Sequence, residues 1–161
     1  MIECEGNLWE IAAAEGAAAV ITTNGSVRRD GCAVMGRGCA LEAKRKFPGI
    51  DRVLGNAITV GGNRVRKIHD ADLTTKPPTI IAFPVKRIWN ASAELAIISR
   101  SCLELLDLLQ PHPAFKPIRR VVVPRPGCGN GRLRWSDVKP VLEALLPGDR
   151  FIVVHRPGEA E

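Results

Sequence analysis

Two glycine-rich segments flanked by arginine carry the residue types best suited to chemistry in this sequence. They span residues 22–39 and 124–133. Glycine lets backbone N–H groups approach an oxyanion closely, and a helix N-terminus behind such a loop adds partial positive charge. Arg37, Arg125 and Arg132 supply further positive charge. The two loops together predict a clamp that holds a pyrophosphate from both sides.

Neither loop matches a standard nucleotide-binding motif. Residues 31–36 have the glycine spacing of a P-loop, but Arg37 and Gly38 stand where Lys and Ser or Thr are needed. Residues 36–41 begin like a dinucleotide fingerprint, but Leu41 replaces the third glycine. The alternative that both loops are ordinary turns rich in turn residues stays open.

Short apolar runs and longer helical patterns alternate along the chain and must position these loops. Strands are expected at residues 18–22, 79–83, 121–123 and 151–154, with weaker candidates at 1–4 and 63–68. Helices are expected at residues 8–15, 39–47, 91–109 and 137–146. In the last helix Asp137 is favoured as the N-cap, because Pro140 then falls in the first turn, where its missing N–H costs nothing.

This alternation predicts an α/β layered fold with a largely parallel or mixed sheet and helices on both faces. Ligands in such folds bind at the carboxyl ends of the strands, and both glycine-rich loops follow a strand there. A chain of 161 residues suits one domain, so residues 1–161 are interpreted as a single domain.

The amino-acid composition limits the classes of binding partner and the cellular compartment that are expected. The net charge of +6 favours a polyanion, whereas aromatic residues at 4% and the absence of Tyr argue against an aromatic platform for single-stranded nucleic acid. The five cysteines show no C-x-x-C pair and the histidines no paired ligand spacing, so neither a metal nor a cofactor is expected. Scattered thiols and an acidic N-terminus predict a soluble cytoplasmic protein.

Four segments resemble the macro domain family. They are residues 6–8 (GNL), 34–40 (VMGRGCA), 83–87 (FPVKR) and 124–135 (PRPGCGNGRLRW). The sequence is similar to the branch that holds the terminal ADP-ribose protein glycohydrolase and the DarG-type antitoxins, over about residues 2–154. The resemblance implies a three-layer α/β/α sandwich with a mixed central sheet, and ADP-ribose as the ligand, free or attached to a macromolecule.

The resemblance also implies an ADP-ribose site. Asn7 stands where many macro domains have an Asp that recognises adenine. Thr22 and Asn24 are alternatives for the contact with the distal ribose, since residues 25–31 make this loop longer than in either relative. The residues carried over are Asn7, Leu8, Thr22, Asn24, Met35, Gly36, Arg37, Gly38, Cys39, Pro126, Gly127, Cys128, Gly129, Asn130, Gly131 and Arg132.

Lys86 aligns with a catalytic lysine of this branch. A neutral amine can attack the anomeric carbon or its open-chain aldehyde, and burial or neighbouring cations such as Arg87 would keep it neutral. The alternative is a solvated or phosphate-neutralising lysine. The glycohydrolase relative has an acid in its second loop where Gly131 stands here, and the other acids considered, Asp30, Asp70 and Asp72, are expected as exposed loop carboxylates.

The resulting hypothesis is an ADP-ribosyl hydrolase that releases ADP-ribose from a DNA base or a protein acidic residue, with a cognate ADP-ribosyltransferase as a further partner. A non-catalytic reader of ADP-ribose or a related metabolite is the first alternative. A charge-driven nucleic-acid-binding module is the second, with Arg28, Arg29, residues 44–46 and residues 64–67 as candidate phosphate contacts. Trp9 and Trp89 offer a face for adenine or serve as packing or a lid, and Trp135 is expected to pack under the second loop.

Overall fold

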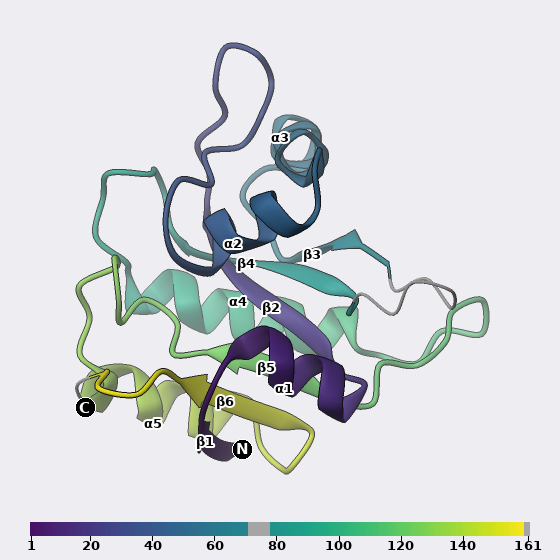
Figure 1. The fold of residues 1–161 in the computed structure, drawn as a ribbon, viewed down its shortest axis with the longest axis vertical. Helices are drawn as coiled ribbons and strands as arrows, with labels where there is room; N and C mark the ends of the chain where they lie inside the picture. The colour runs from purple at the N-terminus through teal and green to yellow at the C-terminus, as the bar shows by residue number, and fades with distance from the viewer. Residues whose placement is uncertain (71–77, 160–161) are drawn as a thin grey trace.

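The computed structural model describes residues 1–70 and 78–159, and its elements alternate as the sequence predicts (Figure 1). The strands are β1 (Ile2–Glu5), β2 (Ala18–Asn24), β3 (Arg66–His69), β4 (Ile80–Lys86), β5 (Val121–Pro124) and β6 (Phe151–His155). The helices are α1 (Leu8–Glu15), α2 (Gly38–Lys46), α3 (Ile50–Gly61), α4 (Leu95–Leu108) and α5 (Trp135–Leu145). Among the described residues, no helix combines the length and apolar character that a bilayer span requires.

All six described strands join one mixed sheet in the order β1-β6-β5-β2-β4-β3. Only β3 runs antiparallel to its neighbour, β4, and the other pairs are parallel. The predicted mixed sheet is therefore confirmed. The central strands β2, β4 and β5 are apolar except near their carboxyl ends because both of their faces are covered, as the continuous hydrophobic runs indicated.

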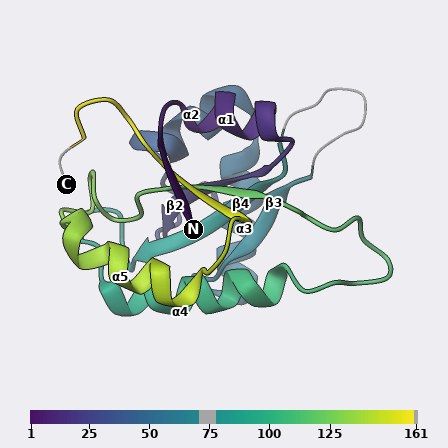
Figure 2. The same cartoon turned by 90° about the horizontal axis from the view of Figure 1, so that it is seen from below.

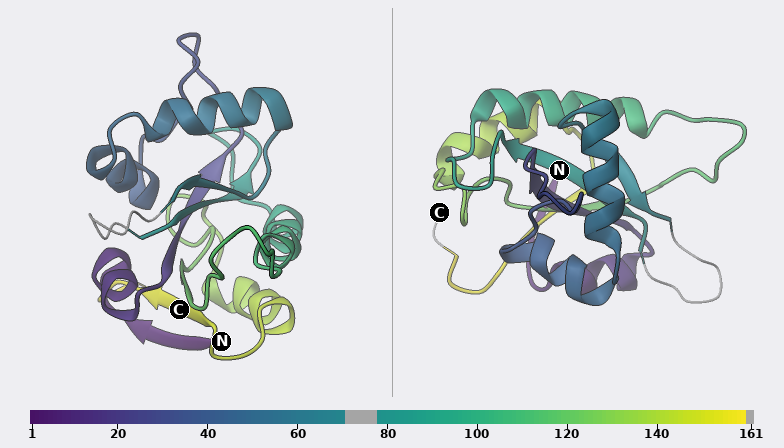
Figure 3. Two further views of the ribbon diagram at one scale, coloured as in Figure 1. Left: turned by 90° about the vertical axis from the view of Figure 1, so that its right-hand side faces the viewer. Right: turned by 90° about the horizontal axis from the view of Figure 1, so that it is seen from above.

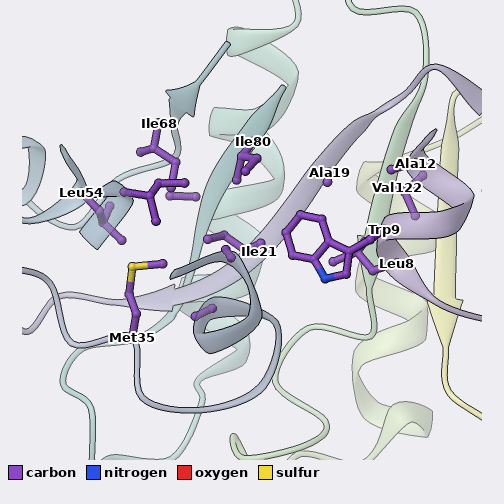
Figure 4. Packing of buried hydrophobic residues seen from close by; sticks show 14 of the residues in the cluster. Leu8, Trp9, Ala12, Ala19, Ile21, Met35, Leu54, Ile68, Ile80 and Val122 are labelled. Atoms are coloured by element: carbon purple, nitrogen blue, oxygen red, sulfur yellow. The ribbon is translucent and has the colours of Figure 1, made fainter. Parts of the chain in front are cut away.

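Helices cover both faces of the sheet, which confirms the three-layer sandwich (Figure 2; Figure 3). Alternate residues of β2 divide between the two cores: Ala19 and Ile21 pack with α1, α2 and α3, whereas Val20 packs with α4 and α5. Figure 4 shows the first core, in which Trp9 and Leu54 come from helices at opposite ends of the layer. The sheet thus fixes the strand ends between two packed layers.

Helix α3 is an element that the sequence patterns did not predict. Ile50 and Leu54 bury one face of it against the sheet. Gly55, Gly61 and the β-branched residues between them have low helix propensity, although Ile50, Val53, Leu54, Ala57 and Ile58 recur at helical spacing. Tertiary packing of the apolar face overrides that propensity.

Helix α5 begins before the predicted start, so the prediction of Asp137 as the N-cap is wrong. Arg134 is the N-cap and Trp135 the first helical residue. Burial of the Trp135 ring against the second core decides this start. Pro140 therefore lies inside the helix, where the Ser136 carbonyl loses its usual helical donor. Asp137 instead accepts two hydrogen bonds from the Arg134 guanidinium.

Strands β2 and β4 extend beyond the predicted ends, to Asn24 and Lys86. Their pairing shifts at this end: Thr23 pairs with Pro84, but Asn24 pairs with Lys86. The extra residue, Val85, makes a bulge-like irregularity of the kind that redirects side chains beside functional sites. Lys86 consequently closes the strand at the edge of the candidate site.

Candidate functional site

A cleft of about 870 Å³ lies at the carboxyl ends of the parallel strands. It sits where the topology switches direction, since the chain leaves β2 toward β4 and leaves β5 toward β6 on the other side. Helices that follow neighbouring strands to opposite faces leave a crevice between them, and ligands bind there in open α/β sheets. The volume is sufficient for a ligand of nucleotide size.

Residues 25–33 of the first loop fold back as a hairpin, and the chain then continues along the cleft through residues 34–38. Val27 and Ala33 form an antiparallel bridge, and Asn24 closes the base by donating from Nδ2 to the Val34 carbonyl and accepting from the Ser26 N–H. Met35 is buried in the first core and anchors the exit of the hairpin (Figure 4). The exposed residues 36–38 then form the cleft wall at the N-terminus of α2.

The second loop is held by contacts with Ala93 and has a strained residue, Arg132, near its end. The Gly131 carbonyl accepts from the Ala93 N–H at 2.9 Å, and Gly127, with φ of 79°, packs against the Ala93 side chain. Arg132 has φ of 66°, a conformation that non-glycine residues rarely adopt, and such strain collects at functional sites. A Cβ on Gly38 would lie 3.5 Å from Asn130 Nδ2, so the two loops meet across the cleft.

Lys86 lies at the β4 end of the cleft, with its side chain partly buried. Its Nζ donates to the Trp89 carbonyl at 2.8 Å, which fixes the amine on the cleft wall. Burial lowers the pKa of Lys86, and the positive charges of Arg132 and then Arg37 lower it further. The structure therefore places one arginine from each loop where its charge acts on this amine, and the lowered pKa favours the neutral, nucleophilic form.

The opposite end of the cleft, near β1 and β6, is closed by Glu42 of α2. Its carboxylate accepts from Trp9 Nε1 at 2.7 Å and pairs with the Arg156 guanidinium. Leu8 and His155 line the same end. An elongated ligand can thus lie along the strand ends, from Leu8 at one end to Lys86 at the other.

Comparison with known proteins shows which family this chain belongs to. No protein-family model matches the chain. It is 34% identical over 111 residues to the DNA ADP-ribosyl glycohydrolase of Mycobacterium tuberculosis, a match that spans 68% of this chain and 30% of that protein. The macrodomain of Mycobacterium tuberculosis DarG superimposes with a TM-score of 0.75 at 29% identity, covering 95% of both chains. This chain is a macro domain of the DarG type. The macrodomain of Thermus aquaticus DarG agrees, with a TM-score of 0.75 at 28% identity over 97% of both chains.

Most residues that sequence analysis assigned to the ligand do line the cleft of this macro domain. They are Leu8, Thr22, Asn24, Met35, Gly36, Arg37, Gly38, Cys39, Gly127, Gly129, Asn130, Gly131 and Arg132, together with Lys86. Thr22 and Asn24 both reach the wall; the Thr22 hydroxyl lies 3.4 Å from Cys39 Sγ, whereas the Asn24 amide is engaged within its own hairpin. Which of them contacts the distal ribose stays a prediction.

Three assigned residues are placed beside the cleft of this macro domain rather than in its wall: Asn7, Pro126 and Cys128. Asn7 caps α1 by accepting from the Trp9 N–H at 2.9 Å. Cys128 Sγ lies 3.7 Å from the Pro126 carbonyl, and burial raises the pKa of this thiol to about 11. Such a thiol is unreactive at neutral pH. Their contacts with a ligand remain predictions.

Gly131 has no room for a side chain. A Cβ there would lie 2.4 Å from the Gly127 carbonyl oxygen and 2.7 Å from the Ala93 Cβ. The second loop of this macro domain is thus built around glycine at the position where the resemblance to the terminal ADP-ribose protein glycohydrolase implied an acid. Asp30 and Asp70 are exposed and pair with Arg28 and Lys67; Asp72 lies outside the described residues.

Two lining residues at the Lys86 end, Arg28 and Trp89, were singled out from the sequence as a candidate phosphate contact and as a candidate adenine face or lid. Three others were not: Asn90 lies at the Lys86 end, and Glu42 and Glu159 lie at the β1–β6 end. No local motif marks them, because they reach the cleft through pairing of strands far apart in the chain. Trp9, by contrast, is core, and Trp135 packs beneath the second loop with the Arg125 guanidinium 4.9 Å from its ring centre. Among the described residues, no His, Cys, Asp or Glu side chains gather as a metal site.

Proposed function

We propose that this macro domain hydrolyses the bond between ADP-ribose and a modified macromolecule, with Lys86 as the catalytic amine. The observation that carries the proposal is the position of Lys86 Nζ, fixed at the cleft wall by the Trp89 carbonyl and facing positive charge from both loops. The curated relatives are named DNA ADP-ribosyl glycohydrolase, which supports DNA as the macromolecule.

The chemistry begins with the lone pair of neutral Lys86, which forms a bond to the anomeric carbon of the distal ribose. The bond from that carbon to the leaving atom breaks, and its electron pair departs with the leaving group, which takes up a proton while the nitrogen loses one. In the ring opening, the bond from the anomeric carbon to the ring oxygen breaks, that oxygen takes up the remaining N–H proton, and a Schiff base forms. Water then adds to the carbon, the carbon–nitrogen bond breaks with a proton passing to the amine, and an aldehyde is left. The ring hydroxyl adds back to this aldehyde, which gives ribose with a free anomeric hydroxyl.

The two loops do the positioning. Backbone N–H groups of residues 36–38, of Gly127 and of residues 129–131, with Arg37 and Arg132, suit the negative charge of a diphosphate. After burial, the same two arginines also lower the pKa of Lys86, so the charges that suit the diphosphate also favour the neutral amine. Because Gly131 cannot carry a carboxylate, proton transfer is assigned to water and the leaving group rather than to a second-loop acid.

Lys86→Ala tests this function. We expect kcat on ADP-ribosylated DNA to fall at least about 100-fold, with the Kd for ADP-ribose, measured calorimetrically, changed less than about threefold. Lys86→Arg is the matched control, because it keeps a cation and hydrogen-bond donors at the Trp89 carbonyl but is never a neutral amine. Borohydride should trap a covalent ADP-ribose adduct on the wild-type protein and none on Lys86→Arg.

The outcomes separate the two leading candidates. Retained turnover in Lys86→Arg would remove the lysine from the mechanism. Tight ADP-ribose binding by a wild-type protein that releases none from modified DNA or acid-linked protein would establish the non-catalytic reader instead. The absence of a carboxylate at position 131 is the observation that favours that second candidate.

We also propose contact with DNA through the hairpin of residues 25–33. Arg28 lines the cleft, and Arg29 is exposed beside it at the tip. Phosphates flanking a modified nucleotide would meet these cations. A cognate ADP-ribosyltransferase that installs the modification is the further partner we infer for this chain.

We infer that residues 1–161 form a single macro domain, since every described strand joins the one sheet. The chain spans about 30% of the length of the curated relatives it matches, and the proposal concerns the macro domain alone. All five cysteines are free, which supports a proposed location in the reducing cytoplasm.

A further inference from the structure

Trp89 is the exposed exception among the tryptophans of this chain. Trp9 and Trp135 are 8% and 3% exposed, whereas Trp89 is 58% exposed. Trp89 also lines the cleft. A large planar ring at the rim of a cleft leaves an apolar face available to a bound ligand.

The backbone of Trp89 is held on both sides. Its N–H donates to the Ser26 hydroxyl at 3.0 Å, and its carbonyl accepts from Lys86 Nζ at 2.8 Å. Ser26 is itself held by Asn24, whose Oδ1 accepts from the Ser26 N–H at 2.9 Å. The ring is therefore presented from a fixed position between the hairpin and the β4 end, although nothing packs over most of it.

The position of Trp89 relative to Lys86 decides which part of a substrate the ring meets. Lys86 must touch the anomeric carbon, so the group that leaves this carbon lies beside Lys86. Gly6 and Leu8 line the other end of the cleft, beyond the ends of β6, β5 and β2, so the ring lies far from that end of an extended ligand. Trp89 thus borders the space for the leaving group.

We propose that the Trp89 ring stacks on the nucleobase that carries ADP-ribose, and so selects a base over a protein carboxylate as the leaving group. This inference rests on the proposed function and names its substrate class. A planar indole offers a π-face to any base, whereas a carboxylate has no ring to stack on it. Asn90, which also lines the cleft, adds an amide that donates and accepts toward the edge of the base.

Binding measurements in the Lys86→Arg background test the stack without dependence on turnover. We expect Trp89→Ala to raise the Kd for an oligonucleotide with ADP-ribose on one base at least about fivefold, the lower limit for a base–aromatic stack. The Kd for free ADP-ribose should change less than about twofold. The backbone bonds to Ser26 and Lys86 do not use the ring, so Trp89→Ala leaves those groups in place.

Trp89→Phe and Ile88→Ala are the matched variants. Trp89→Phe keeps a ring and should retain affinity for the modified oligonucleotide within about threefold. Ile88→Ala removes a neighbouring side chain that is 51% exposed and does not line the cleft, and should change nothing.

Three results would overturn the inference: no change for Trp89→Ala on the modified oligonucleotide, an equal loss for free ADP-ribose, or an equal loss for ADP-ribose linked to a glutamate-containing peptide. A wild-type protein that binds the modified oligonucleotide through Trp89 but never releases ADP-ribose would refute only the hydrolase.

Discussion

Lys86 owes its chemistry to residues that are remote in the chain. Its own position at the end of an apolar strand would leave an ordinary solvated lysine. The tertiary structure adds partial burial and brings Arg132 from the second loop and Arg37 from the first loop toward it. Both arginines are exposed on the rim, so their effect on the amine acts through partly screened charge and is sensitive to salt.

The pH profile follows from this environment. Lys86 acts as a neutral amine, so kcat should rise with pH through its lowered pKa and level off above it. Arg132→Gln removes the larger of the two charge contributions, which raises the pKa toward its ordinary value. The rising limb should therefore move to higher pH and the rate at pH 7 should fall; Arg37→Gln should move it in the same direction by less.

The measurement is the kcat–pH profile at saturating ADP-ribosylated DNA. At saturation, a shift of the profile reports the ionisation of Lys86 and not weaker binding of the substrate by the variants. Added salt should move the wild-type limb in the direction of Arg132→Gln, since screening weakens the same repulsion. A limb that stays in place in both variants would exclude charge tuning of Lys86.

At the scale of elements, α3 supports the first loop. Gly55 lets the hairpin pass against the helix: a Cβ there would lie 2.0 Å from the Gly31 carbonyl oxygen. The Ala33 N–H donates to the Asp51 carbonyl at 2.8 Å at the same crossing. The hairpin carries Ser26, whose hydroxyl accepts from the Trp89 N–H. Two contacts, from α3 to the hairpin and from Ser26 to Trp89, therefore connect α3 with the cleft wall.

Gly55→Ala should therefore lower the free energy of unfolding by about 1–3 kcal/mol, the range for overpacking a close contact. Gly61→Ala in the same helix is the control, because its Cβ meets only the movable end of the Arg66 side chain, and its effect should stay within about 0.5 kcal/mol. Urea unfolding measures both. Equal stability of the two variants would show that the hairpin does not depend on this crossing.

At the scale of the whole molecule, the cations behind the net charge of +6 differ in whether they pair with acidic side chains. Many cations outside the cleft pair with acids, among them Arg64 with Glu104, Arg87 with Glu94, and Arg134 with Asp137. These pairs reduce the field available to a polyanion over those surfaces. Of the cations at the cleft, Arg28 and Arg156 also pair with acids, Asp30 and Glu42. Within residues 1–70 and 78–159, Arg37 and Arg132 of the cleft and Arg29 of the hairpin form no such ion pair, and they hold positive charge at the carboxyl ends of the strands.

Charge reversal at the hairpin tests that distribution. Arg29→Glu should weaken binding of ADP-ribosylated DNA and reduce the slope of log K against log salt by about 1, without changing the Kd for ADP-ribose. Arg119→Glu makes the same change of net charge on an exposed residue before the amino end of β5, away from the cleft, and should do neither. An equal effect of both reversals would favour the charge-driven nucleic-acid-binding module over a directed contact.

The amino-acid sequence by itself determined the layers and the loops. Apolar runs such as that of β2 are buried on both faces, so they predict central strands without knowledge of their partners. The glycines and arginines of the two loops come after predicted strands, and Lys86 comes shortly after the predicted strand at 79–83 and ends β4, so the order of residues along the chain predicted a site at the strand ends. The missed α3 and the wrong N-cap at Asp137 show the limit: propensity and capping rules yielded to burial of Ile50, Leu54 and Trp135.

Only the tertiary structure decided which side chains share the cleft. Pairing of β2 with both β5 and β4 brings the two loops and Lys86 together, and the register shift opposite Asn24 sets the end of β4. Ser26 and Trp89 are 63 positions apart and meet through that pairing. Such contacts depend on strand order and register, which local periodicity does not encode, so the exposed ring beside the amine emerges only when the sheet has assembled.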